Sequence, residues 1–259
     1  TTTPSTLVSN VAPAAHPMLP YVELRRRGRP APQVLLAEAR VRAVLGEDFA
    51  DRWEQVRTWS GKELATFRYR RPLDWLPYPT EGAHEVIVVE DFVSADDGTG
   101  VVHMAPAFGA DDYAAGKRHG LAFMQPVNGR GEFPEGLPVV GGMRVQKADP
   151  AITVVLEERG VLWKAGTHVH SYPHCWRCGT PLIYYARESW FVSTTTFKKR
   201  MLSRNGHVDW HPPEAGSGRF GEWLENNVDW ALSRDRYWGT PLPIWVCDES
   251  TAHAVAIGS

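Results

Sequence analysis

Hydrophobic and polar residues alternate in several short stretches of the first 105 residues, which is typical of half-buried β-strands. In the first 120 residues, helical spacing is confined to short stretches at residues 39–46 and 111–120. This pattern predicts an α+β fold, with a mixed sheet or barrel and few helices. The predicted strands are residues 21–27, 33–39, 63–71, 84–92 and 100–105.

The longest helical pattern in this part covers residues 148–160. Asp149 is expected to cap it, Pro150 to lie in its first turn, and Gly160 to follow its last residue. We expect this helix to close a first domain over residues 1–166.

The remaining residues, 167–259, are expected to form a smaller α/β segment that is rich in tryptophan. Eight of the eleven tryptophans lie from residue 163 onwards. Residues 193–202 and 220–232 have helical spacing, and residues 180–193 have a strand-like composition. The change in composition near residue 165 predicts the domain boundary.

Composition excludes several classes of protein. The chain has 259 residues, 43% hydrophobic and 22% charged, which is ordinary for a globular protein. Its net charge of −2 argues against a protein that holds nucleic acid through overall charge. Without a membrane-length apolar run, and with only three cysteines, we expect a cytoplasmic protein without a membrane partner. Because it lacks an initiating Met, we expect a segment of a longer chain.

A histidine and two aspartates lie close together in "GTGVVHMAPAFGADDY", residues 98–113. His103 belongs to a predicted strand, and Asp111 and Asp112 open a predicted helix, where acidic side chains are favoured. A strand that ends beside a helix start often borders a pocket. The alternative is a histidine of the core followed by a helix cap.

The first ten residues, "TTTPSTLVSN", carry a row of hydroxyl side chains. Such a row can line a polar pocket without adding charge. Taken alone, however, the stretch is more typical of a strand with β-branched residues.

Together these two stretches resemble the isoleucyl-tRNA synthetases, class I enzymes with an inserted editing domain. The resemblance extends to "SYPHCWRCGTPLIYYARESWF" and "DWALSRDRYWGTPLPIW", which are similar to the segments leading back to the catalytic core. It implies a mixed, β-barrel-like editing (CP1-like) domain with short peripheral helices, followed by the connecting segment. Ser5 departs from the family, which usually has tryptophan there.

The resemblance implies hydrolysis of valyl-tRNA(Ile), the mischarged product that the synthetic site releases. An apolar pocket distinguishes isoleucine from valine only weakly, because they differ by one methylene. The family's ATP-binding signatures, His-x-Gly-His and Lys-Met-Ser-Lys-Ser, do not occur in the sequence, so we expect ATP to serve only the full-length enzyme. The expected partners are tRNA(Ile) charged with valine and the remainder of a monomeric synthetase.

The implied site contains seven residues. Asp112 carries a carboxylate that can pair with the α-ammonium of an aminoacyl ester. His103 and Thr6 are expected to narrow the side-chain pocket. No strong nucleophile is evident, so an oriented water is expected to attack the ester. The residues implied as catalytic are Asp112, His103, Thr2 and Thr3, and those implied as substrate-binding are Thr1, Thr6 and Asn10.

Cys175 and Cys178 have the spacing of half a zinc site, and a structural zinc site needs four ligands. The resemblance places the partner pair upstream of Thr1. His170, His174 and Cys247 are the alternative ligands in this sequence. We therefore expect zinc to bind only with the upstream ligands, and no cofactor to be needed for editing.

Two other functions fit the same residues. A non-catalytic tRNA-binding module would use the two arginine clusters, residues 25–29 and 68–71, with the cysteine turn. The editing domain of the related valyl enzyme is the second alternative, although its first motif carries an arginine and an acidic residue that are absent here. Hydrolysis of the ester would distinguish an editing domain from a binding module.

Overall fold

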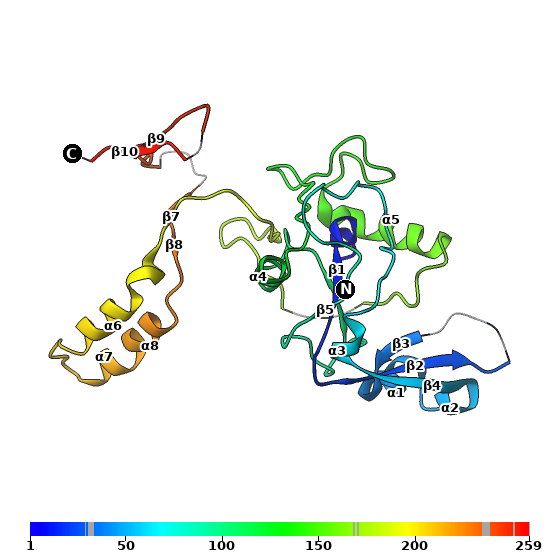
Figure 1. Ribbon diagram of the computed structural model, residues 1–259. Coiled ribbons are helices and arrows are strands. Elements are labelled where there is room, and N and C mark those ends of the chain that lie inside the picture. The colour runs from blue at the N-terminus through cyan, green and yellow to red at the C-terminus, as the bar shows by residue number, and fades with distance from the viewer. Residues whose placement is uncertain are drawn as a thin grey trace. The chain divides into compact units, whose positions relative to one another are not determined.

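The computed structural model describes residues 1–28, 30, 34–167, 169, 171–234, 239–250 and 252–258, so Arg29 and His170 lie outside the described residues. The chain forms two compact units, residues 1–186 and 187–259. The first contains both three-stranded sheets (Figure 1) and the candidate site. The composition change near residue 165 therefore falls inside unit 1, and the functional boundary at 166 stays a prediction.

A small mixed sheet lies at the centre of unit 1. Its middle strand β1 (Ala12–Ala15) pairs in parallel with β5 (Val88–Val89) and antiparallel with β6 (Val101–Met104). β6 confirms the strand predicted at 100–105, whereas only two residues of the predicted strand 84–92 form β5. The register places His103 opposite Pro13, at the edge strand of this sheet.

A second sheet of unit 1 is antiparallel, in the order β3-β2-β4. β2 (Pro20–Arg26) and β3 (Val34–Ala37) confirm two predicted strands, and η2 (Glu38–Arg40) and α1 (Val41–Leu45) follow where a helix was expected. β4 (Trp53–Ser60), which comes after α2 (Phe49–Arg52), was not predicted. Most of its side chains are exposed, so alternation gave little signal. The fold is thus α+β with small sheets, and barrel closure stays a prediction.

The predicted strand 63–71 is wrong, because a short helix, α3 (Gly61–Leu64), occupies its start. The Ser60 side chain accepts a hydrogen bond from the Glu63 N–H, and the Glu63 carboxylate accepts one from the Ser60 N–H, 2.7 Å away. This capping box satisfies two free donors of the first turn. Only Arg68 makes an isolated bridge, to Val86.

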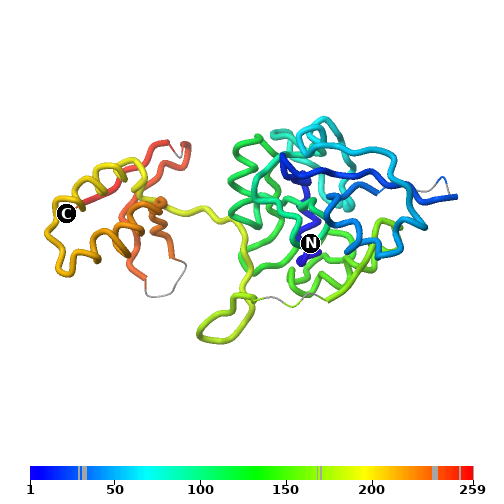
Figure 2. Tube along the Cα trace, turned by 90° about the horizontal axis from the view of Figure 1, so that it is seen from below, coloured from blue at the N-terminus to red at the C-terminus, as the bar shows by residue number. Residues whose placement is uncertain are grey.

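The N-terminal stretch is a 3₁₀-helix, η1 (Pro4–Ser9), and not a strand. It lies against helix α5 (Val145–Glu158), as Figure 1 and Figure 2 show. Ser5, which is buried, donates its backbone N–H to Asp149 Oδ1 at 2.7 Å. Pro4 fixes its φ near the helical value, which favours this turn over a strand.

Helix α5 starts earlier than the sequence predicts. Asp149 and Pro150 lie inside it, so Asp149 is not its cap and instead holds η1 by its side chain. The predicted end is confirmed: Gly160 takes a φ of 67°, and the Val161 N–H donates to the Leu156 carbonyl at 3.0 Å. Helix α4 (Ala110–His119) confirms the helix predicted at 111–120.

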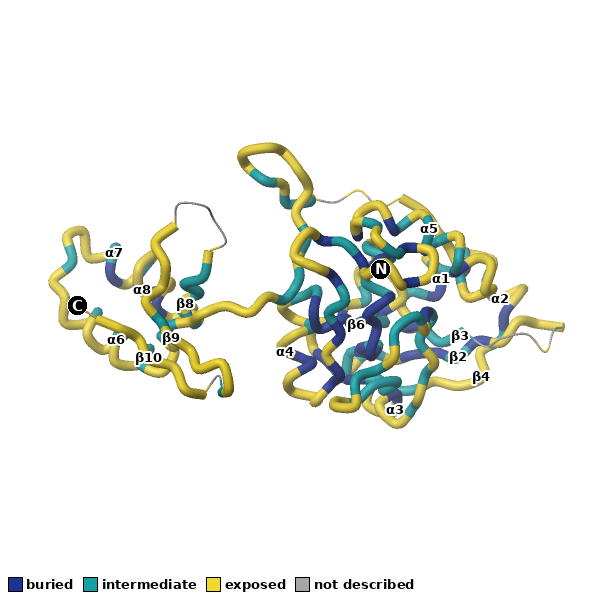
Figure 3. Tube along the Cα trace, turned by 90° about the horizontal axis from the view of Figure 1, so that it is seen from above, coloured by how far each residue is buried: buried dark blue, intermediate teal, exposed yellow. Residues whose placement is uncertain are grey.

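Unit 2 is built from short elements with little buried surface. The predicted helix 193–202 corresponds to η3 (Thr194–Phe197) and α6 (Lys198–Asn205). The predicted helix 220–232 ends early, and the predicted strand 180–193 shrinks to two residues. Most of this unit is exposed (Figure 3), including Trp223 and Trp245. Its other elements are α7 (Glu214–Ser217), α8 (Arg219–Glu225), and the strand pairs β7 (Phe191–Val192) with β8 (Trp230–Ala231) and β9 (Ile244–Val246) with β10 (Ala254–Ala256).

The described helices of both units are too short or too polar to span a bilayer.

Candidate functional site

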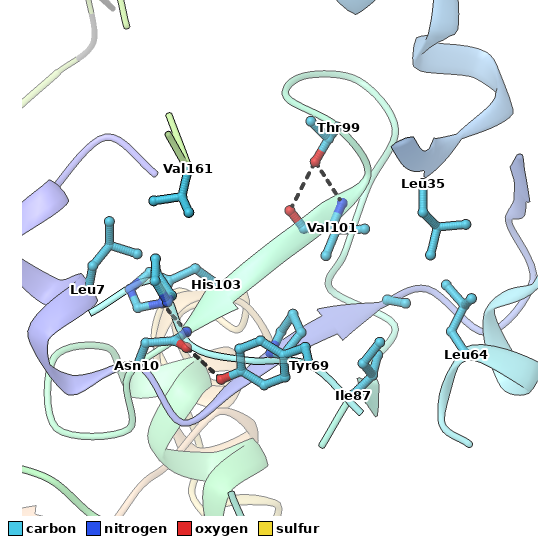
Figure 4. A pocket seen from close by; sticks show the side chains of 13 residues that line it. Leu7, Asn10, Leu35, Leu64, Tyr69, Ile87, Thr99, Val101, His103 and Val161 are labelled. Atoms are coloured by element: carbon cyan, nitrogen blue, oxygen red, sulfur yellow. Dashed lines mark hydrogen bonds between the residues drawn. The ribbon is translucent and has the colours of Figure 1, made fainter. Parts of the chain in front are cut away.

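A pocket of about 530 Å³ opens in unit 1 beside β6. One end is polar and the other apolar: Asn10 and His103 lie together, away from Leu35 and Leu64 (Figure 4). Such a pocket, apolar with a few converging polar groups, is the usual form of a small-molecule site. Its remaining lining residues are Leu7, Pro13, Ala15, Tyr69, Pro72, Ile87, Thr99, Val101 and Val161.

The His103 ring is held on both nitrogens. Its Nε2 lies 2.8 Å from Thr6 Oγ1, and its Nδ1 lies 2.7 Å from Asn10 Nδ2. Thr6 does not itself line the pocket, but its hydroxyl contacts the ring at Nε2. Thr6 and Asn10 belong to the N-terminal stretch, so η1 and β6 together fix the histidine. The structure therefore brings together three of the residues implied by the resemblance.

The hydrogen bonds define which ring nitrogen carries the proton. Asn10 Oδ1 accepts from the Tyr69 hydroxyl at 2.5 Å, and Nδ2 lies 3.4 Å from the Ala12 carbonyl, so the amide directs its donor toward His103. His103 Nδ1 must then accept from this amide, so the proton of the neutral ring is on Nε2 and is donated to Thr6 Oγ1. The Thr6 hydroxyl in turn donates to the Thr3 carbonyl at 2.8 Å. His103 is thus a neutral, directional link.

Burial lowers the pKa of His103 to about 3, because the charged ring would be poorly solvated there. This agrees with the hydrogen bond that the Asn10 amide donates to Nδ1, because a ring protonated on Nδ1 could not accept it. At neutral pH the ring is uncharged.

This depressed pKa predicts a pH-dependent stability. Between pH 6.5 and about 3 the unfolded chain binds a proton at residue 103 that the folded chain does not, so the free energy of unfolding falls as the pH falls. The slope is at most about 1.4 kcal/mol per pH unit. In His103→Gln this part of the slope should disappear. Urea unfolding of the parent and of His103→Gln at pH 7 and pH 5 measures this slope. Equal losses of the free energy of unfolding in the two proteins would contradict the prediction.

Asp112 is the third residue of α4 and holds the end of β6. Its Oδ2 accepts the Ala105 N–H at 2.8 Å. Burial raises the pKa of the Asp112 carboxyl, and this hydrogen bond opposes the rise. Oδ1 makes no hydrogen bond to any described residue, which leaves it able to accept one from a ligand. Asp112 does not line the pocket, and its contact with the strand of His103 is through Ala105.

Of the three threonines at the N-terminus, Thr1 and Thr2 are exposed, and Thr3 is half-buried like Thr6. Thr1 Oγ1 accepts the Thr3 N–H at 3.1 Å, which forms a small local turn. The Thr2 side chain is exposed, and the Thr3 carbonyl accepts from Thr6. The Thr3 carbonyl thus joins the chain of hydrogen bonds and also accepts from Thr1 Oγ1 at 3.3 Å, and the roles implied for these threonines stay predictions.

The cysteine pair forms a tight turn. The Gly179 N–H donates to the Cys175 carbonyl at 2.8 Å, and the Thr180 hydroxyl beside Cys178 lowers the pKa of that thiol. His174 Nδ1 lies 2.8 Å from the Tyr172 carbonyl. The residues that the structure describes contain no group of three or more potential metal ligands. The described residues therefore do not fit a four-ligand zinc site.

Tyr69 was not predicted as a site residue. It lines the pocket and donates its hydroxyl hydrogen to Asn10 Oδ1 at 2.5 Å. The sequence placed it in a strand, and its contact with Asn10 joins residues 59 positions apart. No local signal indicates such a pairing.

Comparison with known proteins adds the following. The family model described as tRNA synthetases class I (I, L, M and V) matches residues 14–257. The isoleucine–tRNA ligase of Streptomyces avermitilis is 46% identical over the whole chain, and that of Thermobifida fusca is 47% identical over 95% of it. The chain covers 24% and 22% of these relatives, about a quarter of their length.

A solved structure, titled "The crystal structure of GlLeuRS-CP1", has a TM-score of 0.48 with this chain at 16% identity. The matched region covers 67% of this chain and 82% of the chain in that structure.

Proposed function

We propose, because the chain belongs to the class I tRNA synthetases, that its first unit is the editing domain of an isoleucyl-tRNA synthetase. Its substrate would be valyl-tRNA(Ile), and its reaction the hydrolysis of the aminoacyl ester. The chain spans about a quarter of its relatives, so ligase activity, ATP use and a role in protein biosynthesis are proposed for the longer protein. We further propose that the longer protein is a cytoplasmic monomer and that this chain binds tRNA as part of the whole synthetase.

The observation that carries this proposal is the hydrogen-bonded group Thr6, His103 and Asn10 at the pocket. Two segments 93 or more residues apart converge on one ring, and both belong to the motifs that resemble the editing motifs. A merely structural histidine would need no such pocket beside it. Leu7 and Val161, which line the pocket beside His103, offer an apolar surface for an aliphatic side chain (Figure 4).

The proposed reaction uses water as the nucleophile. The water oxygen attacks the ester carbonyl carbon, the bond from that carbon to the ribose oxygen breaks, and the ribose oxygen takes a proton. The products are valine and tRNA with a free hydroxyl. Asp112 would hold the α-ammonium through its free Oδ1. The hydroxyls of Thr2 and Thr3 would orient the ribose or the water.

His103 has a different part in this mechanism. A ring whose pKa lies near 3 and whose Nε2 proton is already donated is a poor base at neutral pH. It would instead form the wall of the pocket and keep Thr6 in place. Catalysis would then come from positioning rather than from proton transfer by histidine.

The experiment that tests this function is deacylation of valyl-tRNA(Ile) by the purified chain. We expect release of valine above the spontaneous rate. Retention of the tRNA without hydrolysis would favour the tRNA-binding module. Faster hydrolysis of threonyl-tRNA(Val), the mischarged product of the valyl enzyme, would favour the valyl alternative.

We also propose that the cysteine turn takes its zinc ligands from elsewhere in the longer protein. The turn itself supplies two thiols, those of Cys175 and Cys178, and zinc sites are four-coordinate. Metal analysis of the purified chain is expected to show well under one zinc per molecule. One zinc per chain that resists a chelator, and that is lost in Cys247→Ser, would contradict this.

A further inference from the structure

The chain of hydrogen bonds at the pocket does not end at Asn10. The Tyr69 hydroxyl donates to Asn10 Oδ1 at 2.5 Å, on the side of the amide away from the histidine. A side-chain amide presents an acceptor on one side and a donor on the other. A donor at Oδ1 therefore fixes Nδ2 toward His103 Nδ1. The order of donors runs from Tyr69 through Asn10, His103 and Thr6 to the Thr3 carbonyl.

We propose that Tyr69 is a positioning residue of this site, which sets the proton of His103 on Nε2 and thereby the direction of the Thr6 hydroxyl. It acts through Asn10 and has no part in bond making. Its consequence for hydrolysis rests on the proposed function, whereas the position of the proton does not.

Three observations support this assignment. Asn10 is 3% exposed, so water does not readily replace a lost partner at Oδ1. Burial raises the pKa of Tyr69, so its hydroxyl keeps the proton that it donates. Finally, Tyr69 lies in an irregular segment, where the Tyr69 N–H donates to the Glu85 carbonyl at 3.3 Å. The segment is thus held against the sheet independently of its side chain.

Removal of the hydroxyl should release the amide. In Tyr69→Phe no described residue donates to Oδ1, and a rotated amide would offer Oδ1 to His103 Nδ1. The ring would then carry its proton on Nδ1 and accept at Nε2 from Thr6, which would leave the Thr3 carbonyl. The weak bond from Asn10 to the Ala12 carbonyl, at 3.4 Å, opposes this rotation only slightly.

The test is nitrogen NMR of the full chain labelled in histidine, with His103→Gln to assign the signal. The parent should show the proton on Nε2, and Tyr69→Phe a measurable population on Nδ1. Asn10→Asp, which can only accept, should shift the proton in the same direction while Tyr69 is retained. This second variant keeps the test valid if Tyr69→Phe folds poorly.

The matched control is Tyr21→Phe. Tyr21 is buried, and its hydroxyl donates to the Gly100 carbonyl at 2.7 Å and accepts the His16 N–H at 2.8 Å, so this variant loses two hydrogen bonds, neither of them to His103. It should be destabilised but keep the parent signal and the parent kcat. For Tyr69→Phe, kcat for valyl-tRNA(Ile) should fall about 2- to 10-fold, the equivalent of one hydrogen bond, with KM unchanged.

An unchanged proton position in Tyr69→Phe would overturn the proposal, even if activity fell, because the effect would then be structural. A shift in Tyr21→Phe as well would also overturn it. If the parent does not hydrolyse the ester but the proton moves as expected, the proposed function fails and the positioning of His103 by Tyr69 stands.

Discussion

Asp112→Ala is expected to abolish hydrolysis of both valyl- and isoleucyl-tRNA(Ile). The α-ammonium is common to the two esters, and Asp112 Oδ1 is the carboxylate oxygen left free to bind it. Removal of one partner from a desolvated charge pair costs roughly 2 kcal/mol or more, which predicts a loss of at least about 30-fold in kcat/KM. Steady-state deacylation of each ester measures it.

Two further variants separate the charge from the fold. Asp112→Ala also leaves the Ala105 N–H without its hydrogen-bond acceptor, which costs about 1–3 kcal/mol of stability. Asp112→Asn keeps an acceptor for that N–H and removes only the charge, so it should fold like the parent and still fail. Asp111→Asn changes the exposed neighbour and should remain active. Parent-like hydrolysis by folded Asp112→Asn would refute the role of an ammonium anchor.

His103→Ala and Thr6→Ala are expected to admit isoleucine. The imidazole lines the pocket, so its truncation widens the space for the side chain, and Thr6 Oγ1 holds Nε2 of the ring at 2.8 Å, so truncation of Thr6 leaves the ring free to move away. An extra methylene in a filled pocket costs roughly 1–3 kcal/mol. Relief of that strain predicts about 5- to 150-fold faster hydrolysis of isoleucyl-tRNA(Ile) relative to valyl-tRNA(Ile).

Thr6→Val is the matched control, because it keeps the size of threonine and loses the hydroxyl. If exclusion is steric, Thr6→Val should still reject isoleucine while Thr6→Ala accepts it. If Thr6→Val admits isoleucine as Thr6→Ala does, the hydroxyl, and not the volume, sets the selectivity. If His103→Ala and Thr6→Ala instead lower the hydrolysis of both esters by the same factor, the steric argument fails and His103 has to be assigned to ribose binding or catalysis.

The elements that could be predicted from the sequence are those that bury apolar side chains or carry a clear helix start. β2, β3 and β6 are rich in apolar residues because each contributes buried side chains to the core, and α4 carries acidic residues in its first turn. β4 was missed because it is an edge strand with polar side chains on both faces. The helix α3 could have been found from Ser60 and Glu63, whose spacing is that of a capping box.

The site was predictable only as far as its motifs extend. His103, Thr6 and Asn10 lie in two stretches that the resemblance pairs, and the structure brings them together. Tyr69 lies in neither stretch, and its segment makes few regular backbone contacts. Asp149 was interpreted as a helix cap because Pro150 follows it, although its carboxylate holds Ser5. Contacts between distant segments leave no trace in local patterns.

The most direct test of the central claim is the ratio of two deacylation rates measured with one preparation of the purified chain. Valyl-tRNA(Ile) and isoleucyl-tRNA(Ile) share the tRNA, the ester and the α-ammonium, and differ by one methylene. We predict hydrolysis of the valyl ester above the spontaneous rate and little hydrolysis of the isoleucyl ester. Equal rates for the two esters, or spontaneous rates for both, would contradict an editing site specific for valine in this chain.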